Sequence, residues 1–202
     1  MSDVKPASDH APAMRELTDP STIRALTHPV RLALLEVLAT EGSLTATEAG
    51  ELIGESPTTC SFHFRQLEKY GFTEVATTGP GRQRRWKSAQ VMMSFSETTD
   101  DVEVNIAATS LSRLVTDRAI ARMQQFHETK SNYPREWQEA SDSTEAVLFV
   151  TPSELAELND EILALLTRFH SRLTDINQRP EGSLPVEVLV FRYPVRFSGA
   201  TQ

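Results

Sequence analysis

The fold is decided by residues 45–69, which read TATEAGELIGESPTTCSFHFRQLEK. This stretch holds two signals for the start of a helix. Thr45 and Glu48 have the spacing of a capping box, in which each side chain accepts a hydrogen bond from the backbone of the other residue. Ser56 and Pro57 combine a capping residue with a proline at the first helical position. Because only two residues separate the end of the first helix from the second cap, the sequence predicts a helix-turn-helix unit.

The second helix of this unit is predicted over residues 57–69, and its faces differ in character. Cys60, Phe64 and Leu67 have the spacing of an inward apolar stripe. The rest of the helix surface carries side chains that can reach base edges or phosphates. The candidates for base edges are Thr58, Thr59, Ser61, Phe62, His63 and Gln66. The candidates for phosphates are Ser56, Arg65 and Lys69, and the free N–H groups of a helix start also favour an anion.

Phe62 has two interpretations, because a solvated helix face rarely carries phenylalanine. In the first, its ring touches a thymine methyl group or bases in a groove of DNA. In the second, it packs on a neighbouring helix or on a partner subunit. The sequence leaves both open.

A β-hairpin is predicted directly after the second helix, because the pattern changes to period two from residue 72 onward. A hairpin in this place is a wing, with its tip and return arm over residues 78–87. The polar side chains that it offers to DNA are Arg82, Gln83 and Arg84. Arginine is favoured along a phosphate backbone and in a narrow minor groove. A charged hairpin that resists edge-to-edge pairing is the alternative.

The charge of the chain is divided unevenly. Its 202 residues include 20 Lys and Arg against 28 Asp and Glu, for a net charge of -8. Residues 56–90 nevertheless hold six basic and two acidic side chains. A basic island in an acidic chain indicates a polyanion as partner. A chance cluster of solvated side chains is the alternative.

Composition excludes several other classes of protein. A single cysteine leaves no disulfide framework and no cysteine-rich zinc site. No apolar run reaches the roughly 18 residues that a membrane span needs, and the first residues lack the apolar core of a secretory signal. We expect a cytoplasmic protein that has no membrane partner.

Residues 25–87 resemble the winged-helix domain of the ArsR/SmtB superfamily of bacterial repressors. The pieces that carry the resemblance are LTHPVR (26–31), SFHFRQL (61–67) and GRQRRW (81–86). Two pieces of the second half, YPREW (133–137) and LFVTPSEL (148–155), are similar to longer actinobacterial members of the group. The resemblance implies a homodimeric transcription factor, and it is the only reason to favour repression over activation.

The chain departs from this superfamily where the superfamily binds metal. Metal sensors carry paired cysteines near the helix before the recognition helix, or Asp and His sets on the last helix. Residues 46–52 have no thiol or imidazole, and the five histidines show no ligand spacing. We therefore expect no metal and no cofactor. Cys60 lies on the apolar stripe, where a thiol is a small hydrophobe more often than a redox switch.

The predicted fold class is α+β and mostly α, with a small antiparallel sheet in the second half. The predicted organisation is a mobile tail (1–14), a winged helix-turn-helix domain (15–90), a linker (91–101), and a region for dimerisation and effector binding (102–202). A long helix over 102–128 is the expected dimerisation element, with an intramolecular core helix as the alternative.

The rest of the second half is expected to combine two strands with a helix. Residues 146–150 and a strand within 185–197, centred on 186–191, are predicted to pair. A helix from residue 152 packs on them. Trp137, Tyr133 and Phe149 are candidates to line a pocket for a small-molecule effector, although a plain hydrophobic core explains them better.

The sequence contains no set of residues that points to catalysis, so we do not expect an enzyme. The expected function is a sequence-specific DNA-binding regulator, a homodimer on double-stranded DNA with an inverted-repeat operator. The alternative is a DNA-binding adaptor whose acidic second half docks a protein partner in place of an effector.

Overall fold

The computed structural model describes residues 14–76, 84–89 and 92–195. The N-terminal unit runs through short helices and strands up to the start of a long helix. Its elements are β1 (Arg15–Glu16), α1 (Pro20–Leu26), α2 (Pro29–Glu41), β2 (Ser43–Thr45), α3 (Ala46–Ile53), α4 (Pro57–Lys69), β3 (Thr73–Val75), β4 (Arg85–Ser88) and β5 (Met93–Ser94). The second half consists of α5 (Val102–Thr129), a 3-10 turn (Lys130–Asn132), α6 (Arg135–Ala140), α7 (Pro152–Thr167), α8 (Ser171–Thr174) and a 3-10 turn (Ile176–Gln178).

The helix starts follow the capping signals of the sequence. Thr45 and Glu48 form the expected capping box at α3, with both hydrogen bonds present. Ser56 accepts a hydrogen bond from the backbone N–H of Thr59 at 3.0 Å and so caps α4. Caps of this kind satisfy N–H groups that have no partner inside the helix.

A small antiparallel sheet of order β2-β4-β3 holds the wing against the helices. Trp86 of β4 pairs with Leu44 of β2 on one side and with Val75 of β3 on the other. Its side chain is buried and stacks on Phe64 of α4, with ring centroids 5.3 Å apart. The predicted α+β, mostly α fold class is confirmed, but this sheet lies in the N-terminal unit.

The linker expected over residues 91–101 is partly built into the sheet structure. Met93 and Ser94 form β5, which pairs in parallel with β1 at Arg15 and Glu16. The first half of α5 then packs on the N-terminal core through Val104, Ala107, Ala108 and Leu111, which are all buried. This part of α5 is therefore an intramolecular core helix, which was the alternative interpretation of the long helix.

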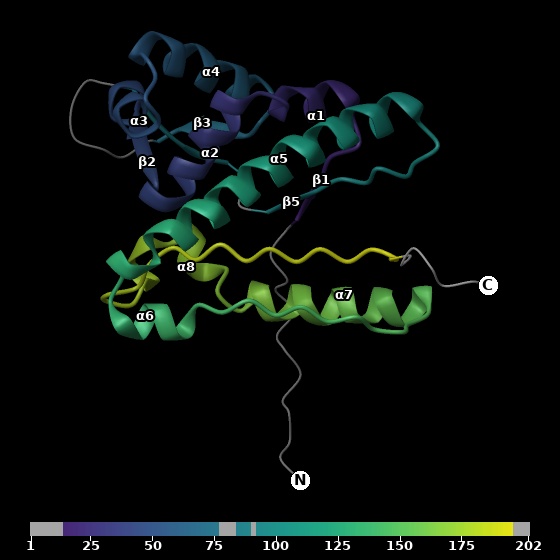
Figure 1. The fold of residues 1–202 in the computed structure, drawn as a ribbon. Helices are drawn as coiled ribbons and strands as arrows, with labels where there is room; N and C mark the ends of the chain where they lie inside the picture. Colours follow the sequence, from purple (N-terminus) through teal and green to yellow (C-terminus); the bar gives the residue numbers. More distant parts are fainter. Residues whose placement is uncertain (1–13, 77–83, 90–91, 196–202) are drawn as a thin grey trace.

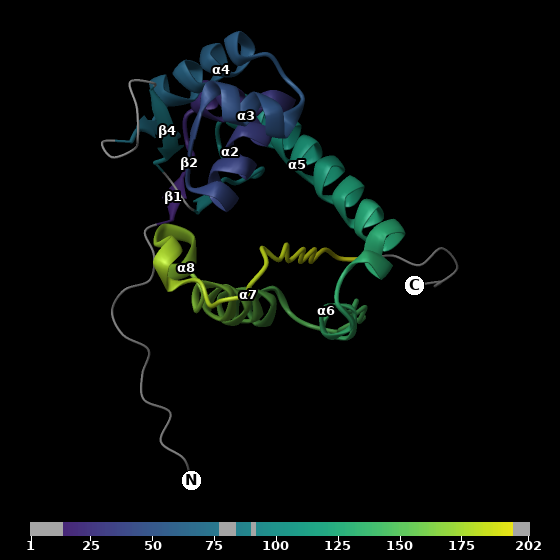
Figure 2. The same ribbon diagram turned by 90° about the vertical axis from the view of Figure 1, so that its left-hand side faces the viewer.

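The C-terminal half lies at the end of the molecule away from α4 (Figures 1 and 2). In both views, α5 slopes from the N-terminal unit toward α6, and α7 lies beneath it with the extended C-terminal segment. This arrangement leaves the exposed face of α4 unobstructed by the rest of the described chain.

The strand pairing expected in the second half is wrong for this single chain. Neither 146–150 nor the described part of 185–197 is a strand. Both segments are extended, yet they form no ladder with each other, and their side chains are exposed. The strand-like sequence patterns are real, but a strand needs a hydrogen-bonded neighbour, which this chain does not bring to either segment.

Candidate nucleic-acid interface

The connection between α3 and α4 depends on close backbone packing at Gly50. A Cβ added at Gly50 would lie 2.5 Å from the carbonyl oxygen of Glu55. The Gly50 carbonyl in turn accepts hydrogen bonds from the N–H groups of Gly54 and Glu55. Gly50 was not among the residues predicted to form the site. Its place within a helix, where glycine is otherwise costly, was the available signal.

The exposed face of α4 combines polar and apolar groups. Ser56, Thr58, Arg65 and Lys69 are exposed, and Phe62 is 55% exposed. Thr59, Ser61 and Gln66 are half-buried. Because Phe62 remains open to solvent, intramolecular packing in the described chain does not account for it.

His63 occupies a different place from the other candidates on α4. Its side chain is only 8% exposed, and its ring lies 4.4 Å from that of His28, centroid to centroid. Burial, followed by the neighbouring His28 and Arg31, lowers the pKa of His63. A neutral buried imidazole is poorly placed to read a base edge, so the geometry does not support a base contact by His63.

The described part of the wing is tied to the helices by ion pairs. Arg84 donates to Glu68 of α4 at 2.7 Å, and its guanidinium lies 4.2 Å from the centroid of the Trp86 ring. Arg85 donates to Glu48 at 3.0 Å and to the Ser43 carbonyl at 2.7 Å. The other two wing candidates, Arg82 and Gln83, lie outside the described residues.

These ion pairs also change the electrostatics of α4. Glu68 is the one acidic side chain within α4, and Arg84 neutralises it. Arg65 and Lys69 have no ion-pair partner among the described residues. The surface formed by α4 and β4 therefore presents net positive charge, as a polyanion site requires.

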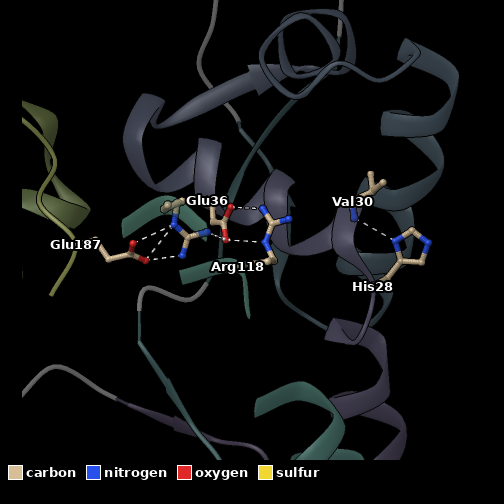
Figure 3. Close-up of polar contacts among 6 residues, drawn as sticks. His28, Val30, Glu36, Arg118 and Glu187 are labelled. Atoms are coloured by element: carbon tan, nitrogen blue, oxygen red, sulfur yellow. Dashed lines mark hydrogen bonds and ion pairs between the residues drawn. The ribbon is translucent and has the colours of Figure 1, made fainter. Parts of the chain in front are cut away.

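A second polar cluster connects the C-terminal half to α2. Arg118 and Arg122 of α5 both bond the carboxylate of Glu36, and Arg122 also bonds Glu187 (Figure 3). Glu187 is the main reason that the pKa of Arg122 is raised. Arg179 donates to the carbonyl oxygens of Thr40 at 2.6 Å and of Ala39 at 3.2 Å. Both connections end on the last turns of α2, which is in contact with α3 and α4.

A groove in the C-terminal half is lined by residues other than those predicted to line an effector pocket. A groove of about 220 Å³ runs between α7 and residues 188–192. Its lining consists of Asn159, Ile162, Leu163, Leu166, Val188, Val190 and Arg192. None of the three predicted aromatic residues lines this groove, and Phe149 is fully exposed.

Clusters of metal-ligand side chains and the environment of Cys60 can be described for the part of the chain that the structure covers. Within the described ranges, no group of three or more His, Cys, Asp or Glu side chains could hold a metal ion. Cys60 is buried, and that burial raises the pKa of its thiol. A thiol in this state is a poor nucleophile. No helix in the described part of the chain is long and apolar enough to cross a membrane.

Comparison with known proteins agrees with this geometry. A family model described as a helix-turn-helix domain matches residues 26–76, which include α2, α3, α4 and β3. A search of curated proteins gave no match. The chain therefore carries a helix-turn-helix DNA-binding domain of the ArsR-like type, which is typical of a transcription regulator.

Proposed function

We propose that the protein is a homodimeric repressor of the ArsR/SmtB superfamily, which binds an inverted-repeat operator and has no catalytic activity. The observation that carries the proposal is the exposed face of α4, which has polar and basic side chains and a single acid neutralised by Arg84. Each copy would place α4 in a major groove, with half-sites separated by about 10 bp or a multiple of it.

The exposed side chains of α4 have two proposed roles, contact with bases and contact with phosphates. Thr58, Phe62 and Gln66 are the proposed base readers, with Thr59 and Ser61 beside them. Arg65 and Lys69 are the proposed phosphate contacts, and the N-terminus of α4, capped by Ser56, is the proposed site of a further phosphate. Phosphate contacts fix the register of the protein on DNA, whereas base contacts supply the sequence preference.

The two copies are proposed to meet through the later part of α5. This part leaves apolar side chains open to solvent, including Val115, Ile120 and Met123. Exposed apolar side chains on a helix that extends beyond its own core are typical of a subunit interface. The winged helix-turn-helix domain (15–90) would then read DNA, and residues 102–202 would hold the dimer.

The test is fluorescence anisotropy of the purified protein on its own upstream DNA and on scrambled DNA, over a series of salt concentrations. We expect preference for the upstream DNA and a steep dependence on salt. Arg65→Ala should weaken binding to both DNAs and flatten the salt slope by roughly one unit. Arg135→Ala on α6 removes the same charge from an exposed site, where the side chain bonds only Glu139 among the described residues, and serves as the control.

Gln66 supplies the complementary variant. Gln66→Ala should change the preference between operator and scrambled DNA by about 1–3 kcal/mol, because it removes a base contact. Equal loss on both DNAs would contradict that role. No binding by the wild-type protein at low salt would contradict the proposed function as a whole.

A further inference from the structure

Within the described residues, the C-terminal half has no hydrophobic core of its own. No residue of α6 or α7 is buried. Apolar side chains that would ordinarily fill a core are open to solvent, among them Leu148, Val186 and Phe191 at 61%, 67% and 54% and the fully exposed Phe149. Exposed apolar side chains gathered in one half of a protein are typical of an interaction site, so this half needs a partner surface.

Two segments of this half also lack backbone hydrogen bonds among the described residues. Residues 146–150 and 186–191 are extended, and within the described chain their backbone N–H and C=O groups form no hydrogen bond. Both sequences are rich in β-branched and aromatic residues, which favour strands. Each segment is therefore an open strand edge, and such an edge is a template for pairing with another chain.

Pairing within one chain is the less favourable solution. Figure 1 shows that both segments run along α7 in the same direction, opposite to that of α7. A ladder between them would be parallel, and parallel pairs are slightly weaker and occur in sheets that are covered on both faces. The fully exposed Phe149 shows that the first segment lacks such a cover in the single chain.

We propose that a second copy of this chain supplies the missing strand: residues 146–150 of each copy pair with residues 186–191 of the other. The inference deepens the homodimer of the proposed function by naming its second contact surface. A reciprocal exchange of this kind closes on itself around a two-fold axis, so it yields a dimer and no open chain of subunits.

The proposed sheet is continuous with the α5 interface. Arg122 of α5 holds Glu187 of the second segment. Ile120 and Met123, which are exposed on α5, lie next to that anchor in the sequence. One partner copy can therefore cover α5 and the segment together. The chain itself carries both complementary strands, which is why we choose a second copy as the occupant over an unrelated protein.

Cross-linking between two differently tagged, co-expressed copies tests the pairing. One copy carries Phe149→Cys and the other Leu189→Cys, and a short bis-maleimide joins thiols that lie close together. We expect a covalent heterodimer, and wild-type protein treated in the same way should give none because Cys60 is buried. A chain with both substitutions should also give a covalent dimer. Cross-linked monomer from that double variant, with no heterodimer from the mixed copies, would overturn the proposal.

A second variant tests the backbone part of the pairing. Val190→Pro removes an N–H from the second segment, and sedimentation should show at least a tenfold weaker dimer. In a Trp137→Phe background, the fluorescence of Trp86 reports that the N-terminal core remains folded. An unchanged dimer constant would argue against strand pairing. If the wild-type protein binds DNA specifically but the two cysteine variants give no covalent heterodimer, only the strand pairing is contradicted. If the variants cross-link but the wild-type protein does not bind DNA, only the proposed function is contradicted.

Discussion

His63 makes the core around α4 sensitive to protons. Burial is the main cause of the lowered pKa of both His63 and His28, and Arg31 adds to it, while Glu55 opposes it. The Nδ1 atom of His28 also accepts a hydrogen bond from the N–H of Val30 (Figure 3), which needs that nitrogen unprotonated. The unfolded chain therefore takes up these protons at a higher pH than the folded chain does.

From this difference follows a prediction for stability against pH. A histidine with a lowered folded pKa contributes its full stability above the unfolded value of 6.5, and the contribution is lost as the pH falls below it. We expect the free energy of unfolding, measured in urea, to decline from pH 7 to pH 5. His63→Gln should flatten that decline. A parallel decline in His127→Gln is the control, because His127 lies on the later part of α5.

Gly50 gives a second prediction for a single residue. Gly50→Ala places a methyl group against the Glu55 carbonyl, so the turn between α3 and α4 must move. We expect a loss of about 1–3 kcal/mol in the free energy of unfolding, as for other overpacked sites. Glu51→Ala changes the neighbouring, exposed position and should be nearly neutral. Equal free energies of unfolding for the two variants would show that the turn adjusts to the added methyl group without loss of stability.

Among the elements, the helices were the most predictable from sequence. Ser56-Pro57 and Thr151-Pro152 placed the starts of α4 and α7 correctly, because capping is decided by neighbouring residues. His63 was harder to place. It follows Cys60 by three residues and precedes Leu67 by four, which is inward spacing, but helix geometry also puts it on the flank of the outward face, among the candidates for base edges. The bonds of Arg84 and Arg85 could not be predicted, because they join residues distant in the sequence.

The cap of α4 yields the prediction at this scale. Ser56→Ala removes the acceptor for the Thr59 N–H. We expect the free energy of unfolding to fall by about 1 kcal/mol, the usual value of such a cap. DNA binding should weaken as well, since the first turn of α4 would fray at the proposed phosphate site. Ser110→Ala removes a hydroxyl from within α5 and is the matched control for thermal and urea unfolding.

At the scale of the whole molecule, the N-terminal and C-terminal halves differ in how they are stabilised. The first has a core of large buried side chains such as Trp86, Phe64 and Leu34. The second is attached by Glu187 and by Arg179. Residues 146–150 and 186–191 have the composition of strands, which is why the sequence predicted strands there. A strand forms only where a neighbouring strand supplies hydrogen bonds, and a local sequence pattern does not show whether one does.

Arg179→Ala tests this attachment. Losing its two bonds to carbonyl oxygens of α2 should cost about 1 kcal/mol and raise the open population of the C-terminal half roughly fivefold. Proteolysis between residues 141 and 195 should become faster by the same factor, with the melting of the N-terminal core unchanged. Arg168→Ala, which removes a cation beside Phe169, provides the comparison. Equal cleavage of the two variants would mean that Arg179 does not hold this half in place.

The attachment at the end of α2 also bears on how freely the sequence can change. Arg179 bonds main-chain carbonyls, and every amino acid at positions 39 and 40 would supply them. Of the contacts described for this junction, only the carboxylate of Glu36 depends on a particular side chain of α2. Substitutions can therefore accumulate along the end of α2 without separating the halves. A C-terminal half from a related chain could be grafted at this junction. It would need arginines equivalent to Arg118, Arg122 and Arg179, and α2 would need only the acid at Glu36.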